Sequence, residues 1–226
     1  AANASATASA IFPDVPVVIG GLEASLRRLT HYDYWDDTLM PTILATCGAD
    51  LLIYGMGELP LKEIANRCKR GESIFDMHDV PQTSYLIEGN KIPEYDGETF
   101  ELFPHLECCK DKMKQAKNFR VIEEESNKME ARRLVQRVDK NHVTVVNPPF
   151  PVMESKDLDA SFDLPYTRLP HPKYKGKRIP AYDMIKFSIN IHRGCFGGCS
   201  FCAISAHQGK HITSRSKESS MREVRE

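Results

Sequence analysis

Two apolar runs near the start of the chain are each ended by glycines and followed by a helical pattern. Residues 16–19 lead into Gly20 and Gly21, and leucines then recur at near-helical spacing. Residues 50–54 lead into a second glycine-rich turn, after which apolar side chains recur at i, i+3, i+4 and i+7 between residues 61 and 68. Each run predicts a buried strand, a turn and an amphipathic helix. Repeated units of this kind predict an α/β fold with a parallel sheet flanked by helices.

The middle of the chain continues with both strand and helix patterns. Its predicted elements are a strand over residues 85–87, a helix over 102–116, a helix over 131–138 and a strand over 142–146. Turn residues at 88–91 place the first strand in a hairpin, and Asn147 with Pro148 ends the last.

Residues 31–37 are aromatic and acidic, and two interpretations fit them. They line a cleft, or they form a surface loop that is pinned by Trp35. We favour the surface loop.

A proline-rich segment divides the chain. Residues 148–180 hold seven prolines and follow neither a helical nor a strand period. Because proline fixes φ and removes a hydrogen-bond donor, we predict an extended connector. The segment is also basic and carries Tyr166 and Tyr174, a combination that suits single-stranded nucleic acid or a linker lying on its neighbours. We favour the linker, and we place a first domain with a hairpin and a helical insertion at residues 1–147, the connector at 148–181 and a last part at 182–226.

Apolar and polar residues alternate from Ile185 to Ile191, which predicts a strand that runs straight into a cysteine-rich loop. The loop holds Cys195, Cys199 and Cys202 in C-x3-C-x2-C spacing, with glycines among them. Thiolates are ligands for iron–sulfur clusters, zinc or copper(I), and glycines let the backbone turn tightly around a bulky group. Three ligands are one short of the four that a four-iron cluster normally takes, so one iron stays open to a further ligand. This arithmetic favours catalysis over plain electron transfer, which is the alternative role for a cluster.

With Phe201 before the last cysteine, the spacing resembles the signature of the radical S-adenosylmethionine (SAM) enzymes. The segments that are similar to the YgiQ-type members of that superfamily are residues 12–28, 31–37, 49–58, 189–194 and 212–219. The resemblance implies a Rossmann-like domain, similar to the cobalamin-binding domains, followed by the first β/α unit of a radical SAM barrel over residues 182–226.

The same resemblance implies the chemistry. Cys195, Cys199 and Cys202 would hold a [4Fe–4S] cluster whose open iron is chelated by SAM, and Phe201 would pack near the SAM adenine. One electron, from a reductant such as flavodoxin or ferredoxin, would cleave SAM to a 5′-deoxyadenosyl radical that takes hydrogen from an unknown substrate. The cofactor carries this chemistry, while the protein positions and shields it.

Cobalamin is a further cofactor that the resemblance raises. In some relatives an Asp-x-His-x-x-Gly segment supplies its lower ligand. Asp76 and His78 begin that pattern here, but Pro81 stands where the glycine belongs. Cobalamin is therefore not supported by the sequence.

A structural zinc module is the competing interpretation of the loop. Cys199, Cys202, His207 and His211 could supply two thiolates and two imidazoles to a tetrahedral site. This arrangement leaves Cys195 and the loop glycines without a role.

The composition of the chain limits which partners and which cellular compartment we expect. The 226 residues carry a net charge of −1, which gives no overall field for nucleic acid. No apolar run is long enough to cross a bilayer, and residues 1–10 lack the basic start and apolar centre of a secretory signal. Seven cysteines with this loop indicate a reduced, cytoplasmic protein rather than a disulfide framework. The cysteines outside the loop are predicted to be structural, with Cys68 and Cys109 on apolar helix faces.

The ends of the chain suggest a piece of a longer protein. Residues 1–10 are nearly all Ala, Ser, Thr and Asn, and the chain stops soon after the cysteine loop. A complete barrel takes at least about 200 residues, and only residues 203–226 follow the cysteine loop. We therefore expect the fragment alone to be inactive.

Overall fold

The computed structural model describes residues 2–225, which divide into two compact units. Unit 1 holds the residues up to Pro151 together with residues 195–211. Unit 2 holds residues 152–194 and the residues from Ile212 onward. The cysteine loop therefore belongs to the same unit as the two strand–helix repeats near the start of the chain.

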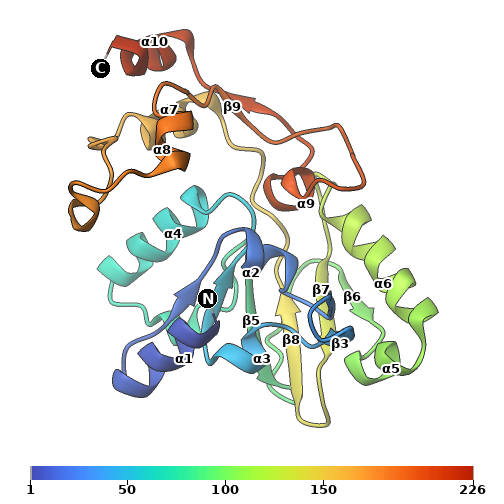
Figure 1. The fold of residues 1–226 in the computed structure, drawn as a ribbon. Helices are drawn as coiled ribbons and strands as arrows, with labels where there is room; N and C mark the ends of the chain where they lie inside the picture. The colour runs from blue at the N-terminus through green and yellow to red at the C-terminus, as the bar shows by residue number, and fades with distance from the viewer. Residues whose placement is uncertain (1, 226) are drawn as a thin grey trace. The chain divides into compact units, whose positions relative to one another are not determined.

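Unit 1 is built on a mixed sheet (Figure 1). In spatial order its strands are β1 (Val18–Ile19), β4 (Leu51–Ile53), β5 (Thr83–Glu88), β8 (His142–Val146), β7 (Arg133–Arg137) and β6 (Thr99–Leu102). β1 pairs with β4 and β6 pairs with β7 in parallel, whereas the three other pairings are antiparallel. A separate hairpin joins β2 (His31–Asp33) to β3 (Thr38–Met40).

The predicted α/β sheet is confirmed, but the prediction that it is parallel throughout is wrong. A tight turn at Asp139, whose carboxylate accepts hydrogen bonds from the backbone N–H groups of Asn141 and His142, returns the chain directly from β7 to β8. So short a connection can join only antiparallel strands. β5 likewise runs against both of its neighbours, so it is a central strand and not one arm of a local hairpin.

Helices cover both faces of this sheet. In unit 1 they are α1 (Ala2–Ile11), α2 (Leu22–Leu26), α3 (Leu44–Cys47), α4 (Glu58–Lys69), the 3-10 turn η1 (Ile74–Asp76), α5 (His105–Lys110), α6 (Lys112–Glu125) and α9 (Ile204–Gln208). The predicted strand–turn–helix units are confirmed as β1–α2 and β4–α4. Successive strand residues point to opposite faces, so Leu52 packs with residues of α2, α3 and α6, whereas Leu51 and Ile53 pack with Ile64 of α4.

The helix predicted over residues 102–116 is confirmed in part, as α5 and the start of α6, and the helix predicted over residues 131–138 is wrong. Leu102 ends strand β6, and the helical stretch that follows is broken at Asp111, which ends α5 and caps α6 by accepting a hydrogen bond from the Met113 N–H. Residues 133–137 form β7, with Leu134 and Val135 buried on opposite faces of the sheet. A strand that is buried on both faces loses its polar alternation, so periodicity alone cannot separate it from a buried helix.

Unit 2 contains more helix than predicted. Its elements are α7 (Ser155–Phe162), the 3-10 turn η2 (Pro172–Tyr174), α8 (Pro180–Ile185), β9 (His192–Arg193), β10 (Thr213–Ser214) and α10 (Lys217–Arg225). The predicted connector therefore includes a helix. Ser216 caps α10, since its hydroxyl accepts a hydrogen bond from the Ser219 N–H at 3.1 Å.

The predicted strand over residues 185–191 is wrong. Pro180 occupies the first turn of α8, a position that suits its fixed φ, and this helix runs to Ile185. Only His192 and Arg193 pair, antiparallel to β10, and no other strand in the described chain offers a partner to residues 185–191. Apart from the one backbone hydrogen bond that the Ile191 carbonyl oxygen accepts from the Arg215 N–H at 2.9 Å, this stretch gains no ladder hydrogen bonds in the described chain, and Phe187 is 92% exposed. The barrel unit that this strand was to begin stays a prediction.

Candidate functional site

Glycine turns at the ends of the parallel pair β1–β4 form a shelf in unit 1. Gly21 follows β1 with φ 90°, and Gly55 follows β4 with φ 71°, both in the region that favours glycine. A Cβ on Gly55 would lie 3.2 Å from the carbonyl oxygen of His207 and 3.2 Å from Gln82 Nε2. Gly55 is therefore required by both its conformation and the close approach of α9.

Ser25 joins this shelf to the cysteine loop. Its fully buried hydroxyl lies 2.9 Å from the Gly21 carbonyl oxygen, 2.9 Å from the Gly55 nitrogen and 2.8 Å from His207 Nδ1. A hydroxyl has one hydrogen to donate and two lone pairs that accept. Donation to Gly21 leaves Ser25 accepting from Gly55 and from a protonated Nδ1 of His207, which satisfies all three contacts.

An ion pair holds the end of the same segment. Lys210 Nζ lies 2.7 Å from Glu123 Oε1 on α6. Residues 204–210 are therefore attached both to the shelf, through His207, and to α6, through Lys210. The sequence predicted the glycine turns, and the structure places α9 over them. Ser25 carried no signal in the sequence because its role depends on contact with a segment 182 residues away.

The cysteine loop brings two of its three sulfur atoms to one glycine. A Cβ on Gly197 would lie 3.3 Å from Cys195 Sγ and 3.8 Å from Cys199 Sγ, so only glycine leaves the space beside both thiols open. The Cys195 N–H donates to the Gly209 carbonyl oxygen at 3.1 Å, which ties the two ends of the loop. The Cys202 N–H donates to the Cys199 carbonyl oxygen at 3.0 Å and turns the chain toward α9.

The three cysteines are not gathered into one ligand set. Within residues 2–225, no group of three or more His, Cys, Asp or Glu side chains is placed to hold a metal ion. Cys195 and Cys202 are half-buried and Cys199 is exposed. Three thiols on a glycine-rich loop, with open space beside two of them, are a donor set whose chemistry suits an iron–sulfur cluster. Phe201 is 91% exposed, so its packing near the SAM adenine stays a prediction.

The zinc interpretation finds no support. His207 is engaged with Ser25, His211 is exposed, and neither joins the cysteines in a group that could hold a metal in the described chain. The structure also gives no support for a cobalamin ligand at His78. Asp76 lies in the turn η1, and the ring of His78 packs on the ring of Tyr85, with 4.4 Å between the ring centroids.

Two further expectations are corrected here. Cys68 and Cys109 are exposed, while Cys47 and Cys108 are buried as small hydrophobic side chains. Trp35 is 78% exposed and therefore pins nothing. Residues 34–37 are exposed, as the surface-loop interpretation predicted, while the side chains of His31, Tyr32 and Asp37 line a cavity, as the cleft interpretation predicted.

An α/β domain that carries a three-cysteine loop is the class of protein that these observations define. Residues 3–188 match the family described as Radical SAM N-terminal, and the chain belongs to this family. The matched residues end before Cys195. No solved structure matches the chain.

Curated relatives extend the comparison through most of the chain. A UPF0313 protein of Porphyromonas gingivalis is 61% identical over 216 residues, which cover 96% of this chain and 34% of the relative. A UPF0313 protein of Methanocella arvoryzae is 46% identical over 95% of this chain and 35% of its own length. The UPF0313 protein YgiQ of Escherichia coli is 38% identical over 93% of this chain and 36% of its own length. The resemblance to YgiQ-type radical SAM proteins is confirmed, and the chain spans about a third of the length of these relatives. No described helix combines the length and the apolar character needed to span a membrane.

Proposed function

We propose that this chain is part of a cytoplasmic radical SAM enzyme whose [4Fe–4S] cluster is held by Cys195, Cys199 and Cys202. The observation that carries the proposal is the open space beside Gly197, onto which two of the three thiols face. A cluster of this kind, when bound, supplies one electron for the reductive cleavage of SAM, and the resulting 5′-deoxyadenosyl radical takes hydrogen from a substrate. The substrate is unknown, and a flavodoxin or ferredoxin would serve as reductant.

The chain's own residues have defined parts in this proposal. The three cysteines bind as thiolates, and the Gly197 N–H, which lies 3.4 Å from Cys195 Sγ, donates to that sulfur and reduces its negative charge. Phe201, next to Cys202, is the residue that would pack on the SAM adenine. Ser25 and His207 fix the segment after the loop to the glycine shelf, so that the thiols are carried on a positioned backbone.

Anaerobic reconstitution with iron and sulfide tests the proposal. Replacing Cys195, Cys199 or Cys202 with Ala should each remove most of the bound iron, because each change takes a ligand from a site that has three. Cys68→Ala is the matched control, since Cys68 is exposed on α4, and it should keep the iron of the wild type. Loss of metal in His211→Ala, with full iron retained in Cys195→Ala, would contradict the proposal and favour zinc.

Addition of SAM separates an enzyme from an electron carrier. In the reconstituted longer YgiQ relative, SAM should change the electron paramagnetic resonance spectrum of the reduced protein. An unchanged spectrum in that protein would leave a cluster that only transfers electrons.

A further inference from the structure

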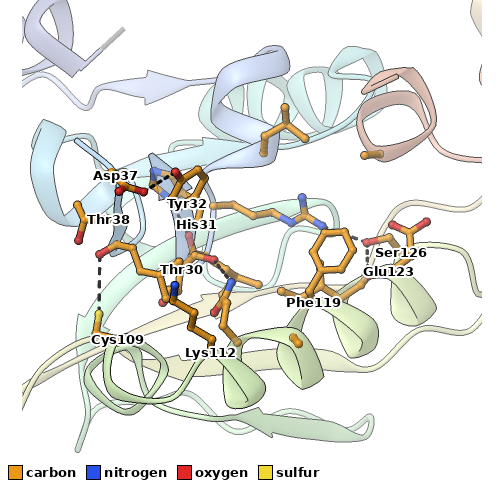
Figure 2. A pocket seen from close by; sticks show the side chains of 18 residues that line it. Thr30, His31, Tyr32, Asp37, Thr38, Cys109, Lys112, Phe119, Glu123 and Ser126 are labelled. Atoms are coloured by element: carbon orange, nitrogen blue, oxygen red, sulfur yellow. Dashed lines mark hydrogen bonds between the residues drawn. The ribbon is translucent and has the colours of Figure 1, made fainter. Parts of the chain in front are cut away.

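The cavity that His31, Tyr32 and Asp37 line in unit 1 does not include Cys195, Cys199 or Cys202 among its lining residues. Its volume is about 700 Å³, within the range of roughly 300–1,000 Å³ that small-molecule sites occupy. It is lined by residues of the β2–β3 hairpin and of α6, among them Thr30, His31, Lys112 and Phe119 (Figure 2). Leu29 and Ile122 give it an apolar wall.

A buried arginine lines this cavity without an acidic partner. Arg28 is 6% exposed. Its two terminal nitrogens donate to the Ser25 carbonyl oxygen and, at 3.0 Å, to Ser126 Oγ, and its guanidinium stacks on the Tyr54 ring at 4.6 Å. Its Nε is buried and has no hydrogen-bond partner.

No carboxylate in the described chain forms an ion pair with Arg28. Glu123, the acidic residue whose charge acts on it, is instead paired with Lys210. Burial lowers the pKa of Arg28, but a guanidinium keeps its proton in proteins. A buried charge without a counter-charge is costly, so its presence beside a cavity indicates an anion that would pair with it.

A buried acceptor in the same cavity is also unsatisfied. Gln115 Nε2 donates to the Thr30 carbonyl oxygen at 3.0 Å. Since a carbonyl can only accept, this contact fixes the amide orientation and turns Oε1 the other way. Gln115 Oε1 is buried and has no partner, so the cavity also offers an acceptor for an N–H or O–H group.

We propose that this cavity binds an amphipathic organic monoanion that carries a hydrogen-bond donor. Its charged group pairs with Arg28, its donor reaches Gln115, and its apolar body lies along Leu29 and Phe119. A single negative charge is favoured because Arg28 supplies one unpaired positive charge and Asp37, which also lines the cavity, repels a second negative charge. The proposal does not depend on the cluster.

Two dyes that differ only in a charged group test the proposed binding of a monoanion on the 226-residue chain. 8-Anilinonaphthalene-1-sulfonate (ANS) has a sulfonate, an N–H donor and an apolar body, and N-phenyl-1-naphthylamine is the same molecule without the sulfonate. Fluorescence titration should give one site at which ANS binds about tenfold more tightly than the uncharged dye. Arg28→Met should abolish this preference, and Arg28→Lys should retain part of it. Equal affinities in the wild type, or a preference that survives in folded Arg28→Met, would overturn the proposal.

Variants that leave Arg28 in place keep the test decisive if Arg28→Met fails to fold. Ala116→Trp fills the cavity from α6 and should weaken both dyes, while Gln115→Leu should weaken ANS several-fold. Arg120→Met is the matched control, because this arginine lies on α6 with its side chain 81% exposed and does not line the cavity. Dye bound to exposed aromatic side chains such as Phe187 would not respond to Ala116→Trp, so unchanged binding in both cavity variants would overturn the proposal.

Competition identifies the charge of the ligand. Octanoate should displace ANS at lower concentration than octyl phosphate does, because the phosphate carries close to two charges at neutral pH. The reverse order would overturn the assignment of a monoanion.

Discussion

Glu125 is a carboxylate that is 2% exposed and still carries its charge. Burial opposes ionisation, but the side chain and backbone N–H of Arg132 and the ammonium group of Lys128 outweigh it and lower the pKa of Glu125 to about 2. The contacts are 2.6 Å to Arg132 Nη2, 2.9 Å to Arg132 N and 2.7 Å to Lys128 Nζ. Since the pKa is lower in the folded state, this carboxylate stabilises the fold above its unfolded pKa, and the contribution is lost as the pH falls from about 4.5 toward 2.

Glu125→Gln should therefore destabilise the chain in a pH-dependent way. The lowered pKa corresponds to about 3 kcal/mol of unfolding free energy at pH 7, on the basis of about 1.4 kcal/mol per pKa unit. Urea unfolding at pH 7 and at pH 3 measures the free energy of unfolding. The difference in this free energy between variant and wild type should be smaller at pH 3. Glu124→Gln, which removes an exposed pair with Arg120, should cost less than about 1 kcal/mol. A gap that is equal at both pH values would contradict the assigned role of the Glu125 charge.

At the same scale, the sequence predicted the candidate ligands but not the residues that support them. Cys195, Cys199 and Cys202 are recognised from spacing, because neighbours in the sequence suffice to define that motif. Arg28 and Ser25 could not be recognised, since their roles arise from contacts with Ser126 and His207, far away in the chain.

At the scale of elements, local sequence patterns identified the strand–helix units. They gave the wrong element type where a strand is buried on both faces. β4 and α4 were predictable because an apolar run, a glycine turn and an amphipathic stripe follow one another. β7 was mistaken for a helix because both of its faces are buried, and residues 185–191 were mistaken for a strand because alternation says nothing about whether a partner is present.

The attachment of α9 to the glycine shelf can be tested on its own. Ser25→Ala leaves the Gly55 N–H and His207 without their shared partner, at a cost of about 1–3 kcal/mol for a buried unsatisfied group. Hydrogen exchange should accelerate in residues 204–210 while β5 and β8 stay protected. Ser9→Ala, which removes one exposed hydrogen bond to Gly48, should leave exchange in residues 204–210 unchanged. Equal protection of α9 in Ser25→Ala and the wild type would show that other contacts hold it.

At the scale of the whole molecule, the two units differ in how well their chain is buried. Unit 1 contains both hydrophobic clusters of the described structure. Unit 2 contains neither cluster; besides the buried Met153 and Leu158 it holds the buried Arg215, which contacts Glu223, Ser219 and the ring of Phe162. The segment between α7 and α8 is exposed almost throughout, and its Arg168 has a positive φ of 54°.

This segment should be the first part of the chain that a protease cuts. Proteolysis needs an exposed backbone that can leave its hydrogen bonds, and residues 163–178 combine exposure with only the short turn η2. They also hold several basic residues that trypsin accepts, among them Lys173, Lys175 and Arg178. Brief digestion followed by mass spectrometry should give first fragments that end at these positions, well before any cut in α4, although α4 contains Lys62 and Arg67. Initial cleavage inside α4 would mean that unit 1 opens more easily than the exposed segment, contrary to the stability expected of a helix packed on the sheet through Ile64.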